Sequence, residues 1–327
     1  MIQRSLGHHG PLVSPVGLGT MSWPGCRFGH RNAPDQAVSP SDAVAMVRTA
    51  LDLGITLFDT AEGYGCGLAE EHLGAALDEA GRPDNVTIVT KIGPLFDSEK
   101  LEGRACNLSR NHVFERVERS LRRLRVNQLD VLLAHWPDPL TPIEETMQAV
   151  ADLKSAGKIS HFGVSNFPND LLASAIACGP VLCNQLPCSL ADRSIEDGRR
   201  EFCLAHNIGI MAYSPIGKGV LSGKYDTTHL PPPEDYRHQR PHFRENFESN
   251  LLLARRIRQV ANDFSTSPVA VALAWTLHLP GITVAIPGAK SPEQIHDHAA
   301  AVELLENPSL LTALDTISPP ESSGSGT

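Results

Sequence analysis

The strongest constraint on the fold of this chain is an alternation of apolar runs of strand length with segments of helical periodicity. The runs cover residues 13–20, 55–59, 86–91, 129–135, 161–166, 181–185, 208–214 and 282–288. Between them apolar residues recur at helical spacing, as Val113, Val117 and Leu121 do. Continuous apolar strands that each precede a helix predict a parallel sheet covered by helices.

Eight such units favour a closed (β/α)8 TIM barrel, an α/β fold, over an open doubly wound sheet. The G-x-G-x-x-G turn that marks the dinucleotide site of an open sheet does not follow the first run. Barrels of this kind take about 250 residues or more, so we expect a single domain over residues 1–317. The Ser-, Gly- and Pro-rich tail 318–327 is expected to be disordered.

Residues that typically start helices or form loops support this alternation of strands and helices. Ser-Pro or Thr-Pro steps at 39–40, 141–142, 267–268 and 291–292 predict helix starts, since a hydroxyl can cap a helix and proline suits its first turn. Residues 215–249 break the alternation and predict a long loop after the seventh strand. For its part 225–249, contact with the cofactor, contact with the substrate pocket and a solvated surface all stay open.

Composition excludes several classes of protein. With 28 basic and 37 acidic residues the net charge is −9, which argues against a nucleic-acid partner. Apolar runs stay shorter than the ~18 residues of a membrane span, and the start lacks the apolar core of a signal peptide. The seven cysteines include no C-x-x-C pair, so we expect reduced thiols and a cytoplasmic location. The histidines have no carboxylate or cysteine at ligand spacing, so we expect no metal.

Polar residues stand where the apolar runs end, and in barrels the active site lies at the carboxyl ends of the strands. We therefore expect these residues to converge on one mouth. They are Asp59 with Tyr64 after the turn 60–63, then Lys91, His135, Ser165-Asn166, Asn184-Gln185 and Tyr213-Ser214.

Seven motifs carry a resemblance to a known family. They are DTAEGYG at 59–65, TK at 90–91, LDVLLAHWP at 129–137, GVSNF at 163–167, NQ at 184–185, AYSPIGKGVLSGK at 212–224 and IPGAKSPEQ at 286–294. In order and spacing they resemble the aldo-keto reductases from about residue 10 to residue 305. The resemblance implies an NAD(P)H-dependent oxidoreductase of EC 1.1.1 type that reduces an aldehyde or ketone to an alcohol.

The chemistry of that reaction explains the residue types. A reduced carbonyl needs a hydride at carbon and a proton for the developing alkoxide. A free tyrosine, with a pKa of about 10, is a weak acid at neutral pH, and a nearby ammonium lowers that pKa. The resemblance implies Tyr64 as general acid, Lys91 and Asp59 as the groups that tune it, and His135 as the group that orients the carbonyl and shares in proton transfer.

The resemblance also implies a nicotinamide cofactor. Gln185, Ser165 and Asn166 resemble the residues that hold the carboxamide, and Tyr213 resembles the aromatic that stacks on the ring. Glycines, lysines and a helix start supply the amides and cations that phosphates need. The remaining cofactor candidates are Gly19, Thr20, Met21, Asp59, Ser214, Pro215, Ile216, Gly217, Lys218, Gly219, Lys224, Gly288, Lys290, Ser291, Gln294 and His298.

Two of these positions depart from the family pattern. Many members carry Arg where Gln294 stands and Asn where His298 stands, and Arg binds a ribose 2′-phosphate more tightly than Gln does. Lys290 and Ser291 can still hold that phosphate, so NADPH is favoured and NADH is the alternative. His298 is either an adenine contact or an exposed helix residue.

The substrate side is predicted more coarsely. The expected walls of a pocket for a small carbonyl compound are Trp23, Trp136 and Met21, together with Tyr64 and His135. The substrate itself, the preferred reaction direction and the choice between monomer and homo-oligomer stay open.

Two other functions compete with this reading. One is a weakly catalytic NADPH-binding redox sensor that resembles the β subunits of voltage-gated potassium channels. The other is a Schiff-base aldolase in which Lys91 attacks a carbonyl.

Overall fold

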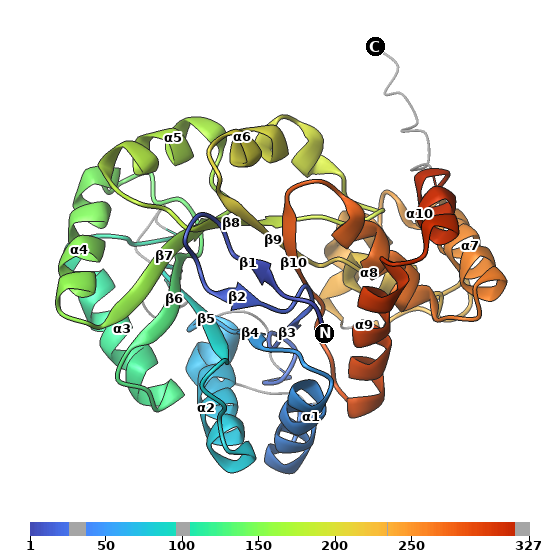
Figure 1. Cartoon of the computed structure of the whole chain (residues 1–327), viewed down its shortest axis with the longest axis horizontal. Coiled ribbons are helices and arrows are strands. Elements are labelled where there is room, and N and C mark those ends of the chain that lie inside the picture. The colour runs from blue at the N-terminus through green and yellow to red at the C-terminus, as the bar shows by residue number, and fades with distance from the viewer. Residues whose placement is uncertain (26–36, 96–104, 234, 318–327) are drawn as a thin grey trace.

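The structure, a computed structural model, describes residues 1–25, 37–95, 105–233 and 235–317. At its centre is a parallel sheet of eight strands (Figure 1). They are β3 (Gly17–Gly19), β4 (Leu57–Asp59), β5 (Thr87–Ile92), β6 (Leu129–Ala134), β7 (Ile159–Ser165), β8 (Cys183–Pro187), β9 (Gly209–Tyr213) and β10 (Ile282–Ile286). They pair in chain order, and parallel bridges from Val16 to Ala285 and from Gly19 to Gly288 join the first strand to the last. The sheet thus closes into the predicted (β/α)8 barrel.

Helices surround the barrel on the outside (Figure 1). They are α1 (Pro40–Asp52), α2 (Leu68–Ala80), α3 (Arg110–Leu124), α4 (Ile143–Ser155), α5 (Asn169–Cys178), α6 (Arg199–Ala205), α8 (Pro268–His278) and α9 (Pro292–Leu304). Two more, α7 (Phe247–Asp263) and α10 (Pro308–Asp315), pack against α8. This packing leaves α8 buried along almost its whole length.

The predicted helix starts are confirmed at three of the four steps, where α1, α8 and α9 begin at Pro40, Pro268 and Pro292. Ser39 accepts a hydrogen bond from the Asp42 amide at 3.1 Å, and Ser267 accepts one from the Ala270 amide at 3.1 Å. The cap at Thr141 is wrong, because its hydroxyl donates to Asp138 and α4 begins only at Ile143. Ser291 stands before α9 without a side-chain cap bond.

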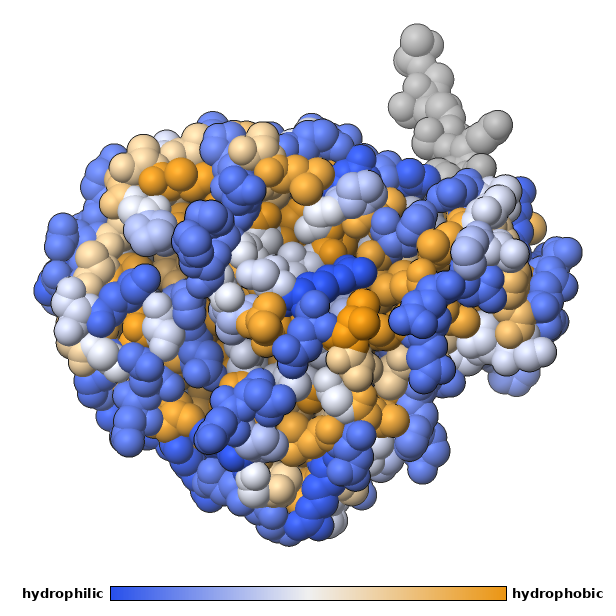
Figure 2. Space-filling view, in the orientation of Figure 1, coloured by the Kyte–Doolittle hydropathy of each residue, from blue (hydrophilic) through white to orange (hydrophobic). Residues whose placement is uncertain are grey.

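A hairpin that the apolar pattern did not predict covers one end of the barrel (Figure 1). It pairs β1 (Arg4–Ser5) with β2 (Leu12–Val13), so the predicted strand 13–20 is split. Leu6 and Val13 are fully buried in the apolar cluster that fills the barrel, and the Arg4 guanidinium donates to the carbonyl of Ile282, the first residue of β10, at 2.9 Å. The hairpin therefore closes the amino-terminal end. Hydrophilic and apolar residues are interspersed over this face (Figure 2).

The segment after β9 is more ordered than the predicted loop. It contains the 3-10 helices η3 (Gly217–Ser222), η4 (Tyr236–Gln239) and η5 (Pro241–Phe243), while η1 (Tyr64–Gly67) and η2 (Ser194–Glu196) lie earlier in the chain. Phe243 is buried, with its ring 5.2 Å from that of Tyr225 and 5.8 Å from that of Phe247. These aromatic contacts hold the segment against the start of α7.

One hydrophobic cluster between the strands and the helices runs from Val16 to Ile317. One domain would have one continuous core, and the single domain over residues 1–317 stays a prediction. The tail 318–327 lies outside the described residues. Within the part of the chain that is described, every helix is too short or too polar to cross a membrane.

Candidate active site

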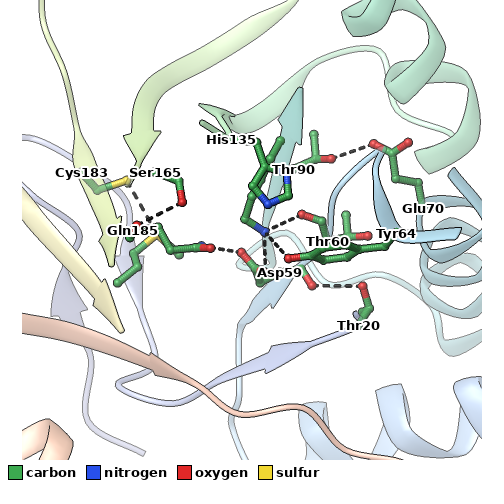
Figure 3. Close-up of polar contacts among 12 residues, drawn as sticks. Thr20, Asp59, Thr60, Tyr64, Glu70, Thr90, His135, Ser165, Cys183 and Gln185 are labelled. Atoms are coloured by element: carbon green, nitrogen blue, oxygen red, sulfur yellow. Dashed lines mark hydrogen bonds and ion pairs between the residues drawn. The ribbon is translucent and has the colours of Figure 1, made fainter. Parts of the chain in front are cut away.

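The carboxyl ends of the strands bring the predicted polar residues together at the open end of the barrel (Figure 3). Asp59 ends β4, Lys91 is the second-last residue of β5, and His135 directly follows β6. Ser165 ends β7 and Gln185 lies in β8. The barrel geometry explains the convergence, since all parallel strands finish on the same side.

The Lys91 ammonium is the centre of this group. Its Nζ donates to Oδ1 of Asp59 at 2.7 Å, to the carbonyl of Thr60 at 2.8 Å and to Oη of Tyr64 at 3.3 Å. An ammonium has three N–H donors, so these three acceptors use all of them. Lys91 has no exposed surface and Asp59 is 3% exposed, so the pair is shielded from water.

Two effects act on the charge of Lys91. Burial lowers the pKa of Lys91 below its usual value, and the carboxylate of Asp59 opposes that shift. Tyr64 Oη accepts from Lys91, so this bond does not use the hydroxyl hydrogen of Tyr64. A Schiff-base nucleophile would need a lone pair on Nζ, and the three donated hydrogen bonds argue against that role.

A compact turn after β4 places Tyr64. The amide of Thr60 donates to Val89 at 2.8 Å, that of Glu62 to Lys91 at 3.1 Å, and that of Tyr64 to Ala61 at 3.1 Å. The first two bonds tie the turn to β5, and the third lies within the turn. The centroid of the Tyr64 ring lies 5.0 Å from Lys91 Nζ. Tyr64 is 8% exposed, so its ring is packed.

The ring of His135 meets the ring of Tyr64 edge to face. The two ring centroids are 5.8 Å apart with the planes at 80°, and the His135 amide donates to Ile92 at 2.9 Å. Burial, and then the charge of Lys91, hold the pKa of His135 well below 6.5. The imidazole is therefore neutral at pH 7, which suits a group that orients a carbonyl oxygen by a hydrogen bond.

Buried ion pairs behind the site were missed by sequence reasoning. Glu70 accepts from the Thr90 hydroxyl at 2.7 Å and pairs with Arg123 at 3.1 Å. Glu62 lies 3.5 Å from Arg116 and accepts from the Gly93 amide at 3.1 Å, yet burial raises the pKa of Glu62 to about 8. The sequence feature that could have indicated these pairs is a charged residue on the apolar face of a helix, such as Arg116 in α3.

A network of hydrogen bonds joins the three residues predicted to hold a carboxamide. The Ser165 hydroxyl donates to the carbonyl of Gln185 at 3.0 Å, and Asn166 Nδ2 donates to that hydroxyl at 2.9 Å. Asn166 Oδ1 accepts from the Tyr213 hydroxyl at 3.0 Å. Asn166 and Ser214 both have left-handed backbones, with φ of 63° and 55°. Such conformations in non-glycine residues are typical of functional sites.

The loop after β9 has a left-handed backbone at Gly217, Lys218 and Gly219, with φ of 54°, 55° and 95°. The amides of Gly217 and Gly219 donate to the carbonyls of Ser214 and Ile216, both at 2.9 Å, so they brace the loop internally. Lys218 Nζ donates to the Ser214 hydroxyl at 3.4 Å. Burial, followed by the charge of Arg240, lowers the pKa of Lys218. The guanidinium of Arg240, between η4 and η5, is therefore a second cation near this loop.

A further group of cations lies at the start of α9. Partial burial lowers the pKa of Lys290, and the positive charges of Arg237 and Lys224 lower it further. The Lys290 amide donates to Gln294 Oε1 at 2.8 Å, so Gln294 braces this turn with its amide oxygen. The carboxylate of Asp235, which pairs with Arg237 at 2.7 Å, opposes this effect, and a phosphate site here stays a prediction.

His298 is not the exposed helix residue that was one of the two readings. It is 2% exposed in α9, and burial lowers its pKa to about 4. The ring is therefore neutral at pH 7. The same burial does not favour a direct contact with adenine, which stays a prediction.

The predicted substrate walls differ in exposure. Trp136 and Met21 are 46% and 43% exposed, whereas Trp23 is fully buried and its indole N–H donates to the carbonyl of Ala289 at 3.2 Å. Burial argues against Trp23 as a wall, because a pocket lining needs a face open to the ligand. Thr20 is also buried, and its hydroxyl and amide both donate to the carbonyl of Asp59, at 3.1 Å and 2.9 Å.

A shallow hollow with a volume of about 630 Å³ adjoins Asn166. It is lined by Asn166, Pro168, Asn169, Asp170, Asp197 and Arg199. Sequence reasoning did not find it, because its walls come from α5 and from the turn before α6.

Comparison with known proteins agrees with this architecture. A family model described as the aldo/keto reductase family matches residues 15–318. Aldo-keto reductase YhdN of Bacillus subtilis is 33% identical over 297 residues, which cover 90% of this chain and 87% of that protein. Probable aldo-keto reductase 1 of Glycine max is 32% identical over 307 residues, which cover 92% of this chain and 85% of that protein.

Solved structures agree as well. The glycerol dehydrogenase AKR11B4 from Gluconobacter oxydans superposes with a TM-score of 0.83 and 31% identity, over 96% of this chain and 94% of that one. The thermostable aldo-keto reductase Tm1743 superposes with a TM-score of 0.74 and 29% identity, over 97% and 100% of the two chains. With a matching family model over nearly its whole length and a barrel mouth of this composition, the chain belongs to the aldo-keto reductase family.

Proposed function

We propose that this protein reduces an aldehyde or ketone to an alcohol with a hydride from NADPH, and that Tyr64 donates the proton. The observation that carries the proposal is the 3.3 Å hydrogen bond from Lys91 to Tyr64 Oη in a shielded site. An ammonium at that distance stabilises the phenolate that is left when the proton departs. Asp59 keeps the ammonium charged and aimed, and neutral His135 orients the carbonyl oxygen.

The residues at β7, β8 and β9 fit a nicotinamide. Ser165, Asn166 and Gln185 offer hydroxyl and amide groups, which can supply both the donors and the acceptor that a carboxamide requires. Tyr213 provides an aromatic face for the ring. The nicotinamide supplies the hydride when bound, and these side chains would decide which ring face meets the substrate.

The phosphates fit the loop 214–219 and the start of α9. Lys218 and the left-handed backbone around it would hold the pyrophosphate, and Lys290 with Ser291 would hold a ribose 2′-phosphate. We favour NADPH because Lys290 has Arg237 and Lys224 as cationic neighbours. We also propose a cytoplasmic protein of one domain whose partner is a small carbonyl compound.

The direct test is a screen of aldehydes and ketones in which the oxidation of NADPH and of NADH is followed by absorbance. The set should include hydroxylated carbonyl compounds, since Asn169, Asp170 and Arg199 line the hollow beside Asn166. We expect turnover with at least one class of carbonyl and a higher kcat/KM with NADPH. Tight NADPH binding without turnover of any carbonyl would instead favour the redox-sensor reading.

Lys290→Met should reduce the preference for NADPH over NADH about tenfold, since a charge-assisted hydrogen bond to a phosphate contributes on the order of 1.5–3 kcal/mol. The change removes the cation and keeps the length of the side chain. Kd values for both cofactors, measured by fluorescence, would show whether only the NADPH value rises. Equal weakening of both would place Lys290 away from the 2′-phosphate.

A further inference from the structure

The side chain of Gln185 reaches across the barrel to the catalytic carboxylate. Its Nε2 donates to Oδ2 of Asp59 at 2.7 Å, while Oδ1 of Asp59 accepts from Lys91 at 2.7 Å (Figure 3). The two oxygens of one carboxylate therefore have separate partners from β8 and β5. The orientation of the Gln185 amide follows from chemistry, because an ionised carboxylate only accepts hydrogen bonds and must face the NH₂ group.

We propose that Gln185 is a positioning residue for proton transfer, which acts on Tyr64 through Asp59 and Lys91 in addition to holding the carboxamide. It does so by keeping the second oxygen of Asp59 away from the Lys91 ammonium. The inference rests on the proposed function, since it concerns the group that we assign as the proton donor.

The argument starts from the limited number of donors on Lys91. The ammonium gives one N–H each to Asp59, Thr60 and Tyr64. A carboxylate whose Oδ2 has lost its partner can turn and grip the ammonium with both oxygens. The third N–H of Lys91 would then leave Tyr64 Oη, and the phenolate would lose its nearest cation.

Water is poorly placed to take over the role of Gln185. Asp59 is 3% exposed and Gln185 is 2% exposed. A buried carboxylate oxygen without a donor is costly, so Asp59 has a strong drive to find another one. The ammonium of Lys91, which already bonds Oδ1 of the same carboxylate at 2.7 Å, is a donor within reach.

Few other charges surround this group. Glu70 from α2 and Cys183 from β8 act on Lys91 along with Asp59, and Lys91 acts on His135 after β6. Burial raises the pKa of the Cys183 thiol, so this group is neutral at ordinary pH. The low pKa of His135 keeps that ring neutral too, so among the residues that the structure describes the ionised group bonded to Asp59 is Lys91.

The same amide can serve the carboxamide at the same time. With Nε2 facing Asp59, Oε1 faces elsewhere and can accept from the NH₂ of a carboxamide. The carboxamide oxygen would then point to donors on the side of Ser165 and Asn166. Gln185 thus links the two parts of the site through one planar group.

The first test uses Gln185→Met in the protein without cofactor. The change keeps the volume and removes the hydrogen bond, so Tyr64 should ionise at a pH about half a unit to one unit higher than in the wild type. Tyrosinate formation is followed by ultraviolet difference absorbance, and each curve is corrected with the matching Tyr64→Phe protein. The chain has four tyrosines, and burial raises the pKa of Tyr213 to about 12, which separates its signal. Identical Tyr64 curves in both proteins would overturn the proposal.

The second test uses Gln185→Glu and the pH profile of kcat at saturating NADPH. A protonated Glu at this position can donate to Asp59 as Gln does, whereas an ionised Glu repels Asp59 and can still accept from a carboxamide. We expect kcat to be rescued at acidic pH and to fall about tenfold or more across an ionisation that the wild type lacks. The Kd for NADPH should not worsen across the same ionisation.

Ser165→Ala is the matched control, because Ser165 belongs to the same carboxamide group and bonds the Gln185 backbone instead of Asp59. It should weaken cofactor binding without adding an ionisation to the kcat profile. A pH-independent loss of kcat in Gln185→Glu, parallel to that of Ser165→Ala, would reduce Gln185 to a cofactor ligand. That result would leave the proposed function intact, which is tested separately by the carbonyl screen and by the turnover of Tyr64→Phe.

Discussion

Replacing Tyr64 with Phe is expected to lower kcat about 10²–10⁴-fold and to leave the Kd for NADPH within about twofold of the wild-type value. The substitution removes one oxygen atom and keeps the ring that packs beside His135. It deletes the acceptor of the third Lys91 N–H together with the proton that we assign to the alkoxide. The loss should therefore fall on the chemical step and not on cofactor binding.

Tyr213→Phe is a control with the same change at the same mouth. Its hydroxyl donates to Asn166 Oδ1 at 3.0 Å, and burial raises the pKa of Tyr213 to about 12, so it is a poor proton donor. We expect a weaker Kd for NADPH and a much smaller change in kcat than with Tyr64→Phe. Single-turnover kinetics with both variants would separate the hydride step from product release. Full turnover in Tyr64→Phe would remove Tyr64 from the mechanism.

Replacing Lys91 with Met is expected to cost stability as well as activity. Removal of one partner from a buried ion pair leaves an uncompensated charge, which destabilises by about 3–5 kcal/mol. Asp59 would keep only the hydrogen bond from Gln185 among its side-chain partners described here. Turnover should fall at least as far as in Tyr64→Phe, because the phenol loses its cation. Urea unfolding at constant pH and steady-state kinetics would measure the two effects.

The double variant Asp59→Asn with Lys91→Met separates those effects. Asn at position 59 removes the stranded charge and can still bond Gln185, so stability should rise above that of Lys91→Met alone. Turnover should stay low, since neither the cation nor its counter-ion is restored. If Lys91→Met alone were as stable as the wild type, the pair would not be the buried ion pair that its geometry indicates.

Much of the site could be predicted from the sequence because a parallel barrel converts chain order into spatial order. Asp59, Lys91, His135 and Gln185 each end or nearly end an apolar run, and the barrel brings those ends to one side. The motif resemblance adds their roles. The same reasoning failed for Trp23, whose position after the first strand indicates the mouth but whose side chain turns into the core. It also failed for the hairpin of β1 and β2, which is too short to show a period.

The sequence by itself determined the (β/α)8 barrel, the end at which its polar residues meet and the family to which the chain belongs, because periodicity and motif order are properties of one dimension. Only the tertiary structure decided how the donors are shared. It determines the three acceptors of the Lys91 ammonium and the burial of His298. It also brings Gln185 to Asp59, which lies 126 positions away in the chain. Such contacts depend on side-chain rotamers and on which neighbours exclude water, and neither is encoded in the spacing of residue types.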